Sequence, residues 1–259
     1  MSRLVTSRRQ LLRLGATAGA GALLSGCKAF DFLGNRDDPV RNALEAANHW
    51  TYRLQRALVG ETLAREYAET EIRQGQKPNG STDPRRSSAD YAALWSRNFA
   101  DYRLTITGLV AAEKRYSLGE LQNMPARTQV TRHDCVEGWS TIAKWTGVPL
   151  SRLLNEAGVK AEARFVVFHC YDFLGNAAYY ESCDLIDALH PQTIAAYGLN
   201  GAALPVPNGA PLRIRIERAL GYKMPKYVHT VELVSDFSRF GLGKGGYWED
   251  RGYDWYAGL

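Results

Sequence analysis

The residues after about position 91 alternate between short strand-like runs and short helical runs, and this pattern constrains the fold more than any other feature. The run at 212–216 reads LRIRI, and its alternation predicts a strand with Leu212, Ile214 and Ile216 on one face and two arginines on the other. Further strands are predicted at 103–107, 129–131, 164–170 and 227–234, and short helices at 140–146, 150–157 and 183–188. The order follows no regular strand–helix–strand repeat, which indicates an α+β fold with mixed β-sheets.

The first 27 residues are predicted to be an export signal and not part of the fold. Arg8 and Arg9 stand in TSRRQLLR, a twin-arginine pattern, and a small-residue run at 14–24 follows. Residues 24–27, LSGC, resemble a bacterial lipobox that ends at Cys27. We therefore expect a periplasmic protein that is exported already folded and held at a membrane by a lipid on Cys27. A soluble protein with a basic tail is the alternative.

The charge of the chain is concentrated in that signal. The formal net charge is +5, but residues 1–26 hold four arginines and no acid, which leaves +1 for the remainder. A nearly neutral mature chain gives no electrostatic support for nucleic-acid binding, so no nucleic-acid partner is expected. No long uncharged apolar run follows the signal, so no transmembrane helix is expected in the mature protein.

Residues 28–90 are predicted to precede the main domain as three segments. Residues 28–38 form a polar tether, and Pro39 then starts a helix whose apolar residues recur at helical spacing. Gly60 is expected to break or kink this helical extension. Residues 75–90 are rich in Pro, Gly and Ser and predict an exposed polar loop.

Glycines at 241–246 match the pattern GxGxxG, but we do not interpret them as a dinucleotide site. Such a site needs a helix directly after the glycines and an acid about twenty residues further on. Thirteen residues of the sequence follow Gly246. The aromatic residues of this segment predict an ordered tail that lies on the domain or forms part of a cofactor or partner surface.

Three cysteines remain after Cys27 is set aside: Cys135, Cys170 and Cys183. A free thiol in an oxidising compartment needs protection by burial or by a metal. A disulfide between Cys170 and Cys183 would leave Cys135 alone. A zinc site with the neighbouring histidines is a further alternative, although their spacing resembles no common zinc pattern. A buried structural cysteine is the plainest alternative.

Two stretches, 131–154 and 205–234, resemble the sulfite-oxidase-like molybdenum enzymes. The matching motifs are RHDCVEGWS at 132–140, WTGVPLSRLL at 145–154, PNGAPLR at 207–213 and GYKMPK at 221–226. The chain is most similar to the haem-free exported members, which include the catalytic subunits of periplasmic protein-methionine-sulfoxide reductases. The resemblance implies a sulfite-oxidase-type molybdopterin-binding fold over 91–259, preceded by the helical extension.

The resemblance also implies one molybdenum ion held by one molybdopterin and by the thiolate of Cys135. A thiolate is a soft ligand that suits such a metal, and the metal in turn keeps the sulfur deprotonated. Arg132 and Glu137 are implied as further catalytic residues beside this ligand. Trp139 and Trp145, which belong to the same segment, are expected to pack in the core.

The cofactor-binding residues implied by the resemblance are Asn48, Thr51, Tyr52, Cys170, Asn208, Arg213, Met224, Pro225 and Lys226. A pterin phosphate needs hydrogen-bond donors, and Arg213 supplies a planar fork while Lys226 supplies a point charge. Asn208 offers an amide with both donor and acceptor. Residues 40–90 match the family more weakly than 90–240, so Asn48, Thr51 and Tyr52 are the least specific of the set.

The function implied is oxygen-atom transfer on a small sulfur or nitrogen oxyspecies, or on a protein sulfoxide. Cys170 and His133 depart from the reductase pattern, so the substrate and the reaction direction stay open. The sequence holds no haem-attachment motif, and electrons are therefore expected to pass to or from a membrane cytochrome b-type subunit or a soluble cytochrome. The alternatives are a cofactor-free lipoprotein binding module and a thiol redox protein that uses Cys170 and Cys183.

Overall fold

A computed structural model describes residues 39–59, 62–73 and 75–258. Contacts divide the chain into two units, residues 1–58 and 59–259, and each is considered by itself. The expected export signal, lipobox and tether lie outside the described residues. No helix within the described ranges is long and apolar enough to cross a membrane.

The N-terminal unit contains one described helix, α2 (Pro39–Val59). It begins at the predicted residue, because a proline at the first helical position loses no hydrogen bond and has a suitable φ. It ends directly before Gly60, where the sequence predicted a break. The prediction of a helical extension is confirmed.

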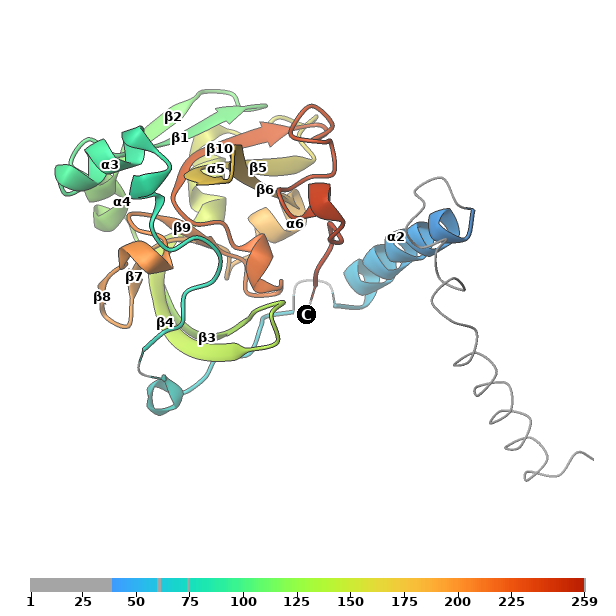
Figure 1. Ribbon diagram of the computed structural model, residues 1–259, viewed down its shortest axis with the longest axis horizontal. Coiled ribbons are helices and arrows are strands. Elements are labelled where there is room, and N and C mark those ends of the chain that lie inside the picture. The colour runs from blue at the N-terminus through green and yellow to red at the C-terminus, as the bar shows by residue number, and fades with distance from the viewer. Residues whose placement is uncertain (1–38, 60–61, 74, 259) are drawn as a thin grey trace, which may run out of the picture. The chain divides into compact units, whose positions relative to one another are not determined.

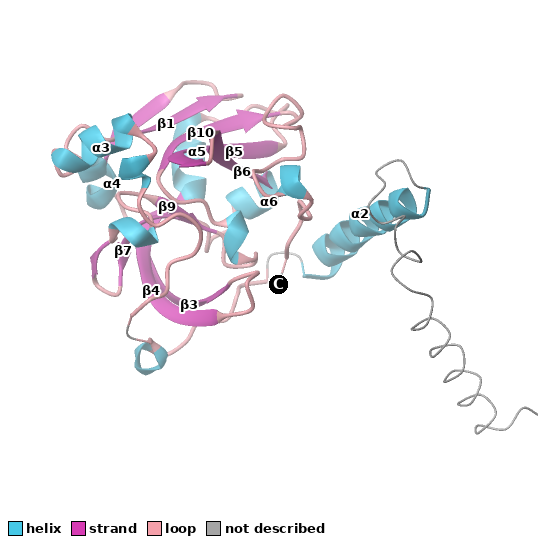
Figure 2. Ribbon diagram, in the orientation of Figure 1, coloured by secondary structure: helices cyan, strands magenta, loops and turns pink. Residues whose placement is uncertain are grey.

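The second unit is built from short strands and shorter helices (Figures 1 and 2). The strands are β1 (Arg103–Gly108), β2 (Lys114–Ser117), β3 (Arg127–Asp134), β4 (Ser140–Pro149), β5 (Phe165–Leu174), β6 (Ala177–Asp184), β7 (Ile194–Leu199), β8 (Ala202–Ala203), β9 (Arg213–Arg215) and β10 (Val228–Val234). The helices are α3 (Ala89–Ser96), α4 (Leu118–Asn123), α5 (Leu150–Ala157) and α6 (Leu185–Ala188). Single 3-10 turns occupy Glu69–Glu71, Pro84–Arg86, Val206–Asn208, Gly221–Lys223 and Glu249–Arg251.

Two sheets form this unit. The first has the order β2-β1-β10-β5-β6, in which β1 and β10 run parallel and the other pairs antiparallel. The second has the order β3-β4-β7-β8, with β9 also paired to β7. Mixed sheets with few short helices confirm the predicted α+β class.

Helix α5 covers part of the main apolar core. Leu150, Leu153, Leu154 and Ala157 are all buried, and their spacing places them on one face of the helix. They join a cluster that includes residues of β1, β5 and β10. The helix ends at Gly158, whose φ of 73° is left-handed and favours glycine. The helix predicted at 150–157 is therefore confirmed.

The helix predicted at 140–146 is wrong, because these residues belong to β4. Thr141, Ala143 and Trp145 are buried while the residues between them are partly exposed, so the burial period is two and not 3.6. The whole of β3 pairs with this segment, from Asp134 opposite Ser140 to Arg127 opposite Gly147. Cross-strand pairing thus decides the conformation of a short run whose local sequence does not. The helix predicted at 183–188 is likewise shorter than expected, since β6 extends to Asp184.

The LRIRI run forms β9, but neither of its faces meets solvent. Leu212, Ile214 and Ile216 lie in the apolar core as expected. Arg213 and Arg215 on the opposite face are only 2% and 0% exposed. Buried guanidinium groups require partners, which makes this strand important for the site.

We expect Gly147→Ala to destabilise the fold strongly, because an added Cβ would overlap the backbone of Ala195 where β4 passes β7. The strand backbone must shift to make room, and such overpacking lowers the free energy of unfolding by roughly 1–3 kcal/mol. Gly119→Ala is the matched control, since nothing lies within 4 Å of its added Cβ. Denaturant unfolding of both variants would measure this, and equal stability would contradict the assigned β4–β7 contact.

Candidate active site

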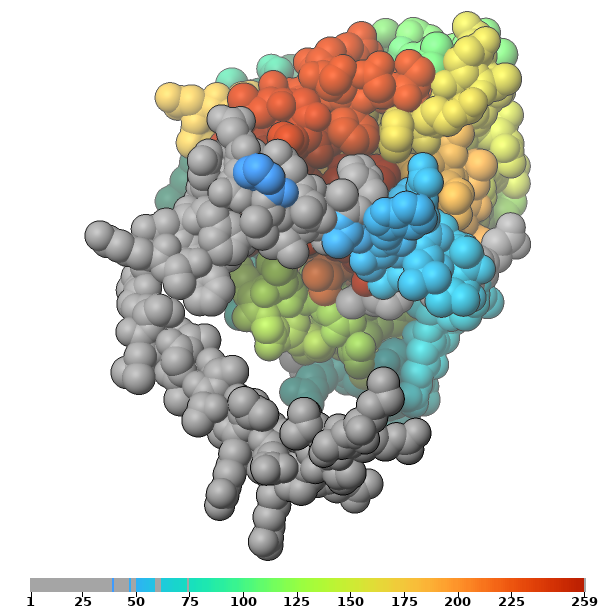
Figure 3. All heavy atoms as spheres, turned by 90° about the vertical axis from the view of Figure 1, so that its right-hand side faces the viewer, coloured from blue at the N-terminus to red at the C-terminus, as the bar shows by residue number. Residues whose placement is uncertain are grey.

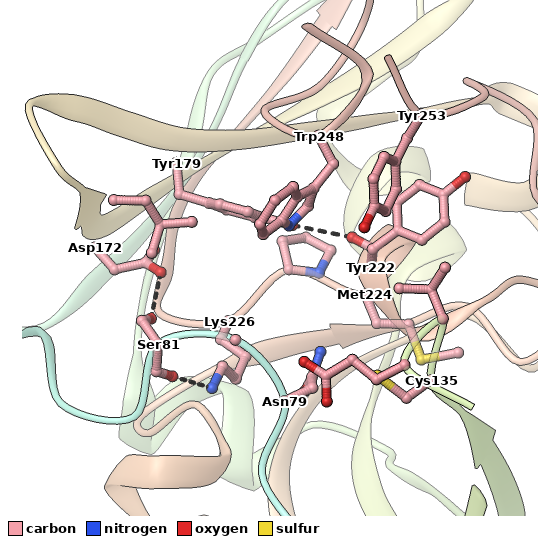
Figure 4. A pocket seen from close by; sticks show the side chains of 15 residues that line it. Asn79, Ser81, Cys135, Asp172, Tyr179, Tyr222, Met224, Lys226, Trp248 and Tyr253 are labelled. Atoms are coloured by element: carbon pink, nitrogen blue, oxygen red, sulfur yellow. Dashed lines mark hydrogen bonds between the residues drawn. The ribbon is translucent and has the colours of Figure 1, made fainter. Parts of the chain in front are cut away.

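A pocket in the second unit gathers residues from six separate segments. Its cavity volume is about 100 Å³. Its described lining residues are Asn79, Gly80, Ser81, Cys135, Val136, Glu137, Asp172, Leu174, Tyr179, Tyr222, Met224, Pro225, Lys226, Trp248 and Tyr253. Figure 4 shows Cys135 and Met224 at one side of the pocket and Ser81, Lys226 and Asp172 at the other.

Cys135 follows directly after β3, in a tight turn that aims its thiol at the pocket. Its N–H donates to Trp139 O at 2.9 Å, and the Gly138 N–H donates to Cys135 O at 3.0 Å. Gly138 has a φ of 85°, which this turn requires. Cys135 is 9% exposed, and this burial raises the pKa of its thiol. A bound metal cation reverses that effect by stabilising the thiolate, so the position suits a metal ligand.

Two polar side chains lie in the pocket with Cys135. Glu137 comes from the same turn, and its carboxylate accepts from Trp139 Nε1 at 2.8 Å. Asn79 comes from the loop before α3, and its amide donates to Gly221 O at 3.3 Å. The pocket therefore places a thiol, a carboxylate and an amide around one space.

The far side of the pocket holds a cluster of buried donors. Lys226 Nζ donates to Pro207 O at 2.9 Å and also to Ser81 O. Arg213 donates to Asn208 O at 3.0 Å and to Met224 O at 3.3 Å. The third nitrogen of that guanidinium, Arg213 Nε, is buried and has no hydrogen-bond partner within the described part of the chain.

These two cations have little compensating charge. Burial and the nearby Arg215 lower the pKa of Arg213 to about 9, and burial and Arg213 lower the pKa of Lys226 to about 7. An uncompensated buried charge costs several kcal/mol, so the cluster fits an anion with several acceptor oxygens. Gly209 leaves room there, because an added Cβ would stand 3.0 Å from Lys226 and 3.1 Å from Arg213. The residues present thus fit a phosphate such as that of molybdopterin.

Behind the cluster, a second arginine is fully satisfied. Arg215 forms an ion pair with Glu217 at 2.7 Å, and both side chains are 0% exposed. Arg215 also contacts His133 Nδ1 at 2.8 Å. The indole of Trp145 lies beneath both guanidinium groups, with Cζ of Arg213 and Arg215 at 4.9 and 4.3 Å from its ring centre. The expectation that Trp145 packs in the core is confirmed, and its packing is against cations.

Asp172 adds a buried carboxyl group to the same side of the pocket. Ser81 Oγ donates to one of its oxygens at 2.6 Å, and the other oxygen is buried without a partner among the described residues. Burial raises the pKa of Asp172, whereas Ser81 and Lys226 act in the opposite direction. Asp172 lies two residues after Cys170 on β5, and both residues are buried.

The C-terminal segment forms one wall of the pocket through Trp248 and Tyr253. It is held by Lys223, whose Nζ contacts Glu181 at 2.6 Å and Glu249 at 2.5 Å, all three side chains being buried. In the space-filling view this segment, coloured red, lies beside the yellow β5–β6 region (Figure 3). The prediction of an ordered tail on the domain is confirmed.

The GxGxxG glycines have a steric role in that wall. An added Cβ on Gly241 would overlap the carboxylate of Asp250, and one on Gly246 would overlap that of Glu249. Asp250 accepts from Leu242 N at 2.9 Å and from Tyr180 Oη at 2.8 Å. No α-helix follows these glycines in the described residues, so the expectation that they form no dinucleotide site agrees with the geometry.

The structure brings some of the predicted residues together. Cys135, Glu137, Met224, Pro225 and Lys226 line the pocket. Asn208 and Arg213 do not line it, but Arg213 donates to the lining residue Met224 and to Asn208 O.

Other predicted residues lie elsewhere. Arg132 forms an ion pair with Asp134 at 2.9 Å and lines a different pocket. Cys170 is 4% exposed in the apolar core and not among the lining residues. Asn48, Thr51 and Tyr52 lie on α2, which belongs to the other unit, and their role in cofactor binding stays a prediction.

The remaining alternatives for the cysteines find no support in the described residues. Cys135, Cys170 and Cys183 are all free and buried. Cys183 pairs with Val166 across the β5–β6 hairpin, four residues from Cys170, which separates the two by about 13 Å along the strand. No group of three or more His, Cys, Asp or Glu suited to a metal occurs in the described ranges, which disfavours the zinc alternative.

The lining residues that the sequence analysis missed include Asn79, Ser81, Asp172, Trp248 and Tyr253. Asn79 and Ser81 belong to the segment predicted as an exposed polar loop. They lie over the pocket because Lys226 and Tyr227 both donate to Ser81 O. The dense aromatic composition of the C-terminal tail was a usable signal for Trp248 and Tyr253, whereas nothing local marks Asp172.

We expect the free energy of unfolding of protein without a bound anion to rise by about 2 kcal/mol between pH 7 and pH 9. Lys226 has a folded-state pKa of about 7, so at pH 9 the folded chain lacks a proton that the unfolded lysine still binds. Raising the pH therefore favours the folded state. Denaturant unfolding at both pH values measures this rise, and Lys226→Met should flatten it. An identical rise in that variant would contradict the account.

Comparison with known proteins agrees with this geometry. A family model described as oxidoreductase molybdopterin binding domain matches residues 92–239. A putative protein-methionine-sulfoxide reductase subunit YedZ1 from Azospira oryzae is 37% identical over 255 residues, which are 97% of this chain and 88% of that protein. The protein-methionine-sulfoxide reductase catalytic subunit MsrP from Ralstonia nicotianae is 31% identical over 51% of this chain and 44% of its own length.

Among solved structures, the sulfane dehydrogenase SoxCD from Paracoccus pantotrophus aligns with a TM-score of 0.49 and 25% identity, covering 53% of this chain and 39% of that one. The family match spans more than half of the chain, and it includes Cys135, Asn208, Arg213 and Lys226. As the sequence resemblance predicted, the chain belongs to the oxidoreductase molybdopterin-binding family and is a molybdopterin-dependent oxidoreductase.

Proposed function

We propose that this chain is the catalytic subunit of a sulfoxide reductase, and that its substrate is methionine sulfoxide. The observation that carries the proposal is the charge and composition of the pocket. Among its described lining residues Lys226 is the one cation, and it belongs to the anion cluster opposite Cys135. Near the thiol, the charged side chain among those lining residues is the acid Glu137, which disfavours an anionic substrate such as sulfite and admits a neutral sulfoxide.

An aromatic wall supports this substrate. Tyr253 contacts Tyr222 edge to face at 5.2 Å and stacks on Trp248 at 5.4 Å between ring centres. Figure 4 shows these three side chains grouped on the same side of the pocket. Aromatic rings bind the methyl and sulfur of a thioether favourably. The two relatives compared above are named as methionine-sulfoxide reductase subunits, which agrees with this chemistry.

The proposed cofactor site follows from the same residues. Cys135 ligates the metal, and Asn208, Arg213, Met224, Pro225 and Lys226 hold the pterin and its phosphate. Molybdenum, when bound there, supplies two-electron oxygen-atom transfer. Arg132 and Cys170 have other surroundings in the structure, so we assign them no contact with the substrate.

The reaction consumes two electrons and two protons: the sulfoxide S–O bond breaks, and a thioether and one water form. Glu137 is the carboxyl group closest in sequence to Cys135 in the pocket, and its hydrogen bond from Trp139 fixes its orientation. We assign Glu137 to carry a proton to the departing oxygen. The electrons come from a separate cytochrome, and an exported chain tethered through Cys27 would meet such a donor at a membrane.

The alternatives fit the structure less well. A cofactor-free binding module would carry the buried cations Arg213 and Lys226 without an anion, at a cost in stability. A thiol redox protein needs an accessible cysteine pair, yet Cys170 and Cys183 are buried and free. Burial raises the pKa of both thiols well above the usual value, which makes them poor nucleophiles.

Separate activity assays with methionine sulfoxide and with sulfite test the proposed function. With reduced viologen as the electron donor, we expect turnover of methionine sulfoxide, and with a chemical oxidant as the acceptor we expect no turnover of sulfite. We expect this difference because the acidic and aromatic lining disfavours the sulfite anion and suits a neutral sulfoxide. Sulfite oxidation without sulfoxide reduction would overturn the proposal while leaving the cofactor assignment intact.

We expect Cys135→Ser to lower reductase activity by more than about 100-fold. This loss is larger than the one expected when a residue that only supports a metal ligand is replaced. A hydroxyl is a hard ligand that replaces the soft thiolate, while its similar size preserves the fold. Cys183→Ala is the control, since this buried thiol lies outside the pocket and its loss should leave turnover intact. Activity in Cys135→Ser equal to that of the control would exclude Cys135 as the ligand.

A further inference from the structure

The exposed side of α2 carries an apolar stripe. Trp50, Leu54 and Leu58 follow one another at intervals of four residues, so they lie along one face of the helix. Their exposed fractions are 69%, 59% and 75%. A contiguous row of large apolar side chains on a surface helix marks a contact with something less polar than water.

The charge of α2 indicates what that contact is. Arg53 lies next to the stripe, with its Cζ 5.8 Å from the Trp50 ring, and Arg56 lies 5.4 Å from the ring of Tyr52. In sequence, α2 contains three arginines and one acid, Glu45. A positive helix with Trp and Leu on one face complements a surface that is anionic outside and apolar within.

We propose that α2 lies flat on an anionic phospholipid surface, with Trp50, Leu54 and Leu58 inserted between the headgroups and with Arg53, which flanks the stripe, on the lipid phosphates. The helix has 21 residues, so it would cover about 31 Å of membrane surface. It is too polar to cross the bilayer. Trp50 suits such a position, because its indole is apolar with one polar N–H.

The position of α2 in the chain agrees with this occupant. It begins twelve residues after Cys27, the proposed lipid attachment site, and an extended tether of that length reaches at most about 43 Å. The helix is therefore within reach of the membrane that would hold the anchor. It would give the catalytic subunit a second membrane contact that does not depend on the lipid, and it assigns α2 a role other than cofactor binding.

The test uses the full chain with Cys27→Ser, so that no lipid is attached and every other segment stays constant between variants. Co-sedimentation is measured with vesicles of phosphatidylethanolamine and phosphatidylglycerol, and with vesicles of phosphatidylcholine. We expect Leu54→Gln with Leu58→Gln to weaken binding by about tenfold or more, since each leucine loses its burial in the bilayer. Leu54→Met with Leu58→Met is the matched control and should bind as the parent does.

A second pair of variants tests the charge. Arg53→Gln should weaken binding to the anionic vesicles and leave binding to phosphatidylcholine unchanged, whereas Arg53→Lys should retain both. Pterin content and turnover with reduced viologen should stay the same in all variants, which shows that each has folded.

Three results would overturn the proposal. One is equal vesicle binding by the parent and the Leu-to-Gln variant. Another is an absence of vesicle binding together with binding to membranes that contain the electron-donor protein, which would make the partner of the stripe a protein. The third is a lower thermal stability of the catalytic unit in the Leu-to-Gln variant, which would mean that the stripe packs on the chain itself. None of these outcomes bears on sulfoxide reduction.

Discussion

The ion pair between Arg215 and Glu217 is the interaction on which the site depends. It is completely buried, and Gln129 on β3 donates to Glu217 at 2.9 Å while His133 contacts Arg215. Removing either charge would leave the other uncompensated in the interior, which is far more costly than the pair itself is stabilising. The pair therefore fixes β3 against β9. Because Cys135 follows directly after β3, this contact also sets where its thiol points.

The same strand presents one arginine that is satisfied and one that is not. Arg215 is paired with a carboxylate. Among the described residues, Arg213 packs on the indole of Trp145 and donates to two backbone carbonyls, and its Nε has no partner. With Lys226, it forms a cluster that is unfavourable until an anion binds. Cofactor binding and stability are thus coupled, since anything that binds only the folded chain stabilises it. A chain of this kind is most stable when it is loaded.

Much of this arrangement could be predicted, and the failures have physical causes. Cys135, Arg213 and Lys226 were found because the motifs around them resemble those of the sulfite-oxidase-like molybdenum enzymes. Residues 140–146 were predicted as a helix, because the local sequence of so short a run does not distinguish a helix from a strand. Pairing with β3 makes this run a strand. The loop residue Ser81 was missed because its position depends on Lys226, 145 residues away. Such long-range contacts cannot be predicted from the local sequence.

The most direct test of this account is the molybdenum and pterin content of the protein purified from a molybdenum-replete cytoplasm. One molybdenum and one pterin per chain are expected. In Arg213→Ala we expect pterin retention to be weaker by roughly 1.5–3 kcal/mol, the value of one charge-assisted hydrogen bond. A folded protein that contains neither molybdenum nor pterin, or an Arg213→Ala variant with full occupancy, would contradict the claim that the buried cations exist to hold the cofactor.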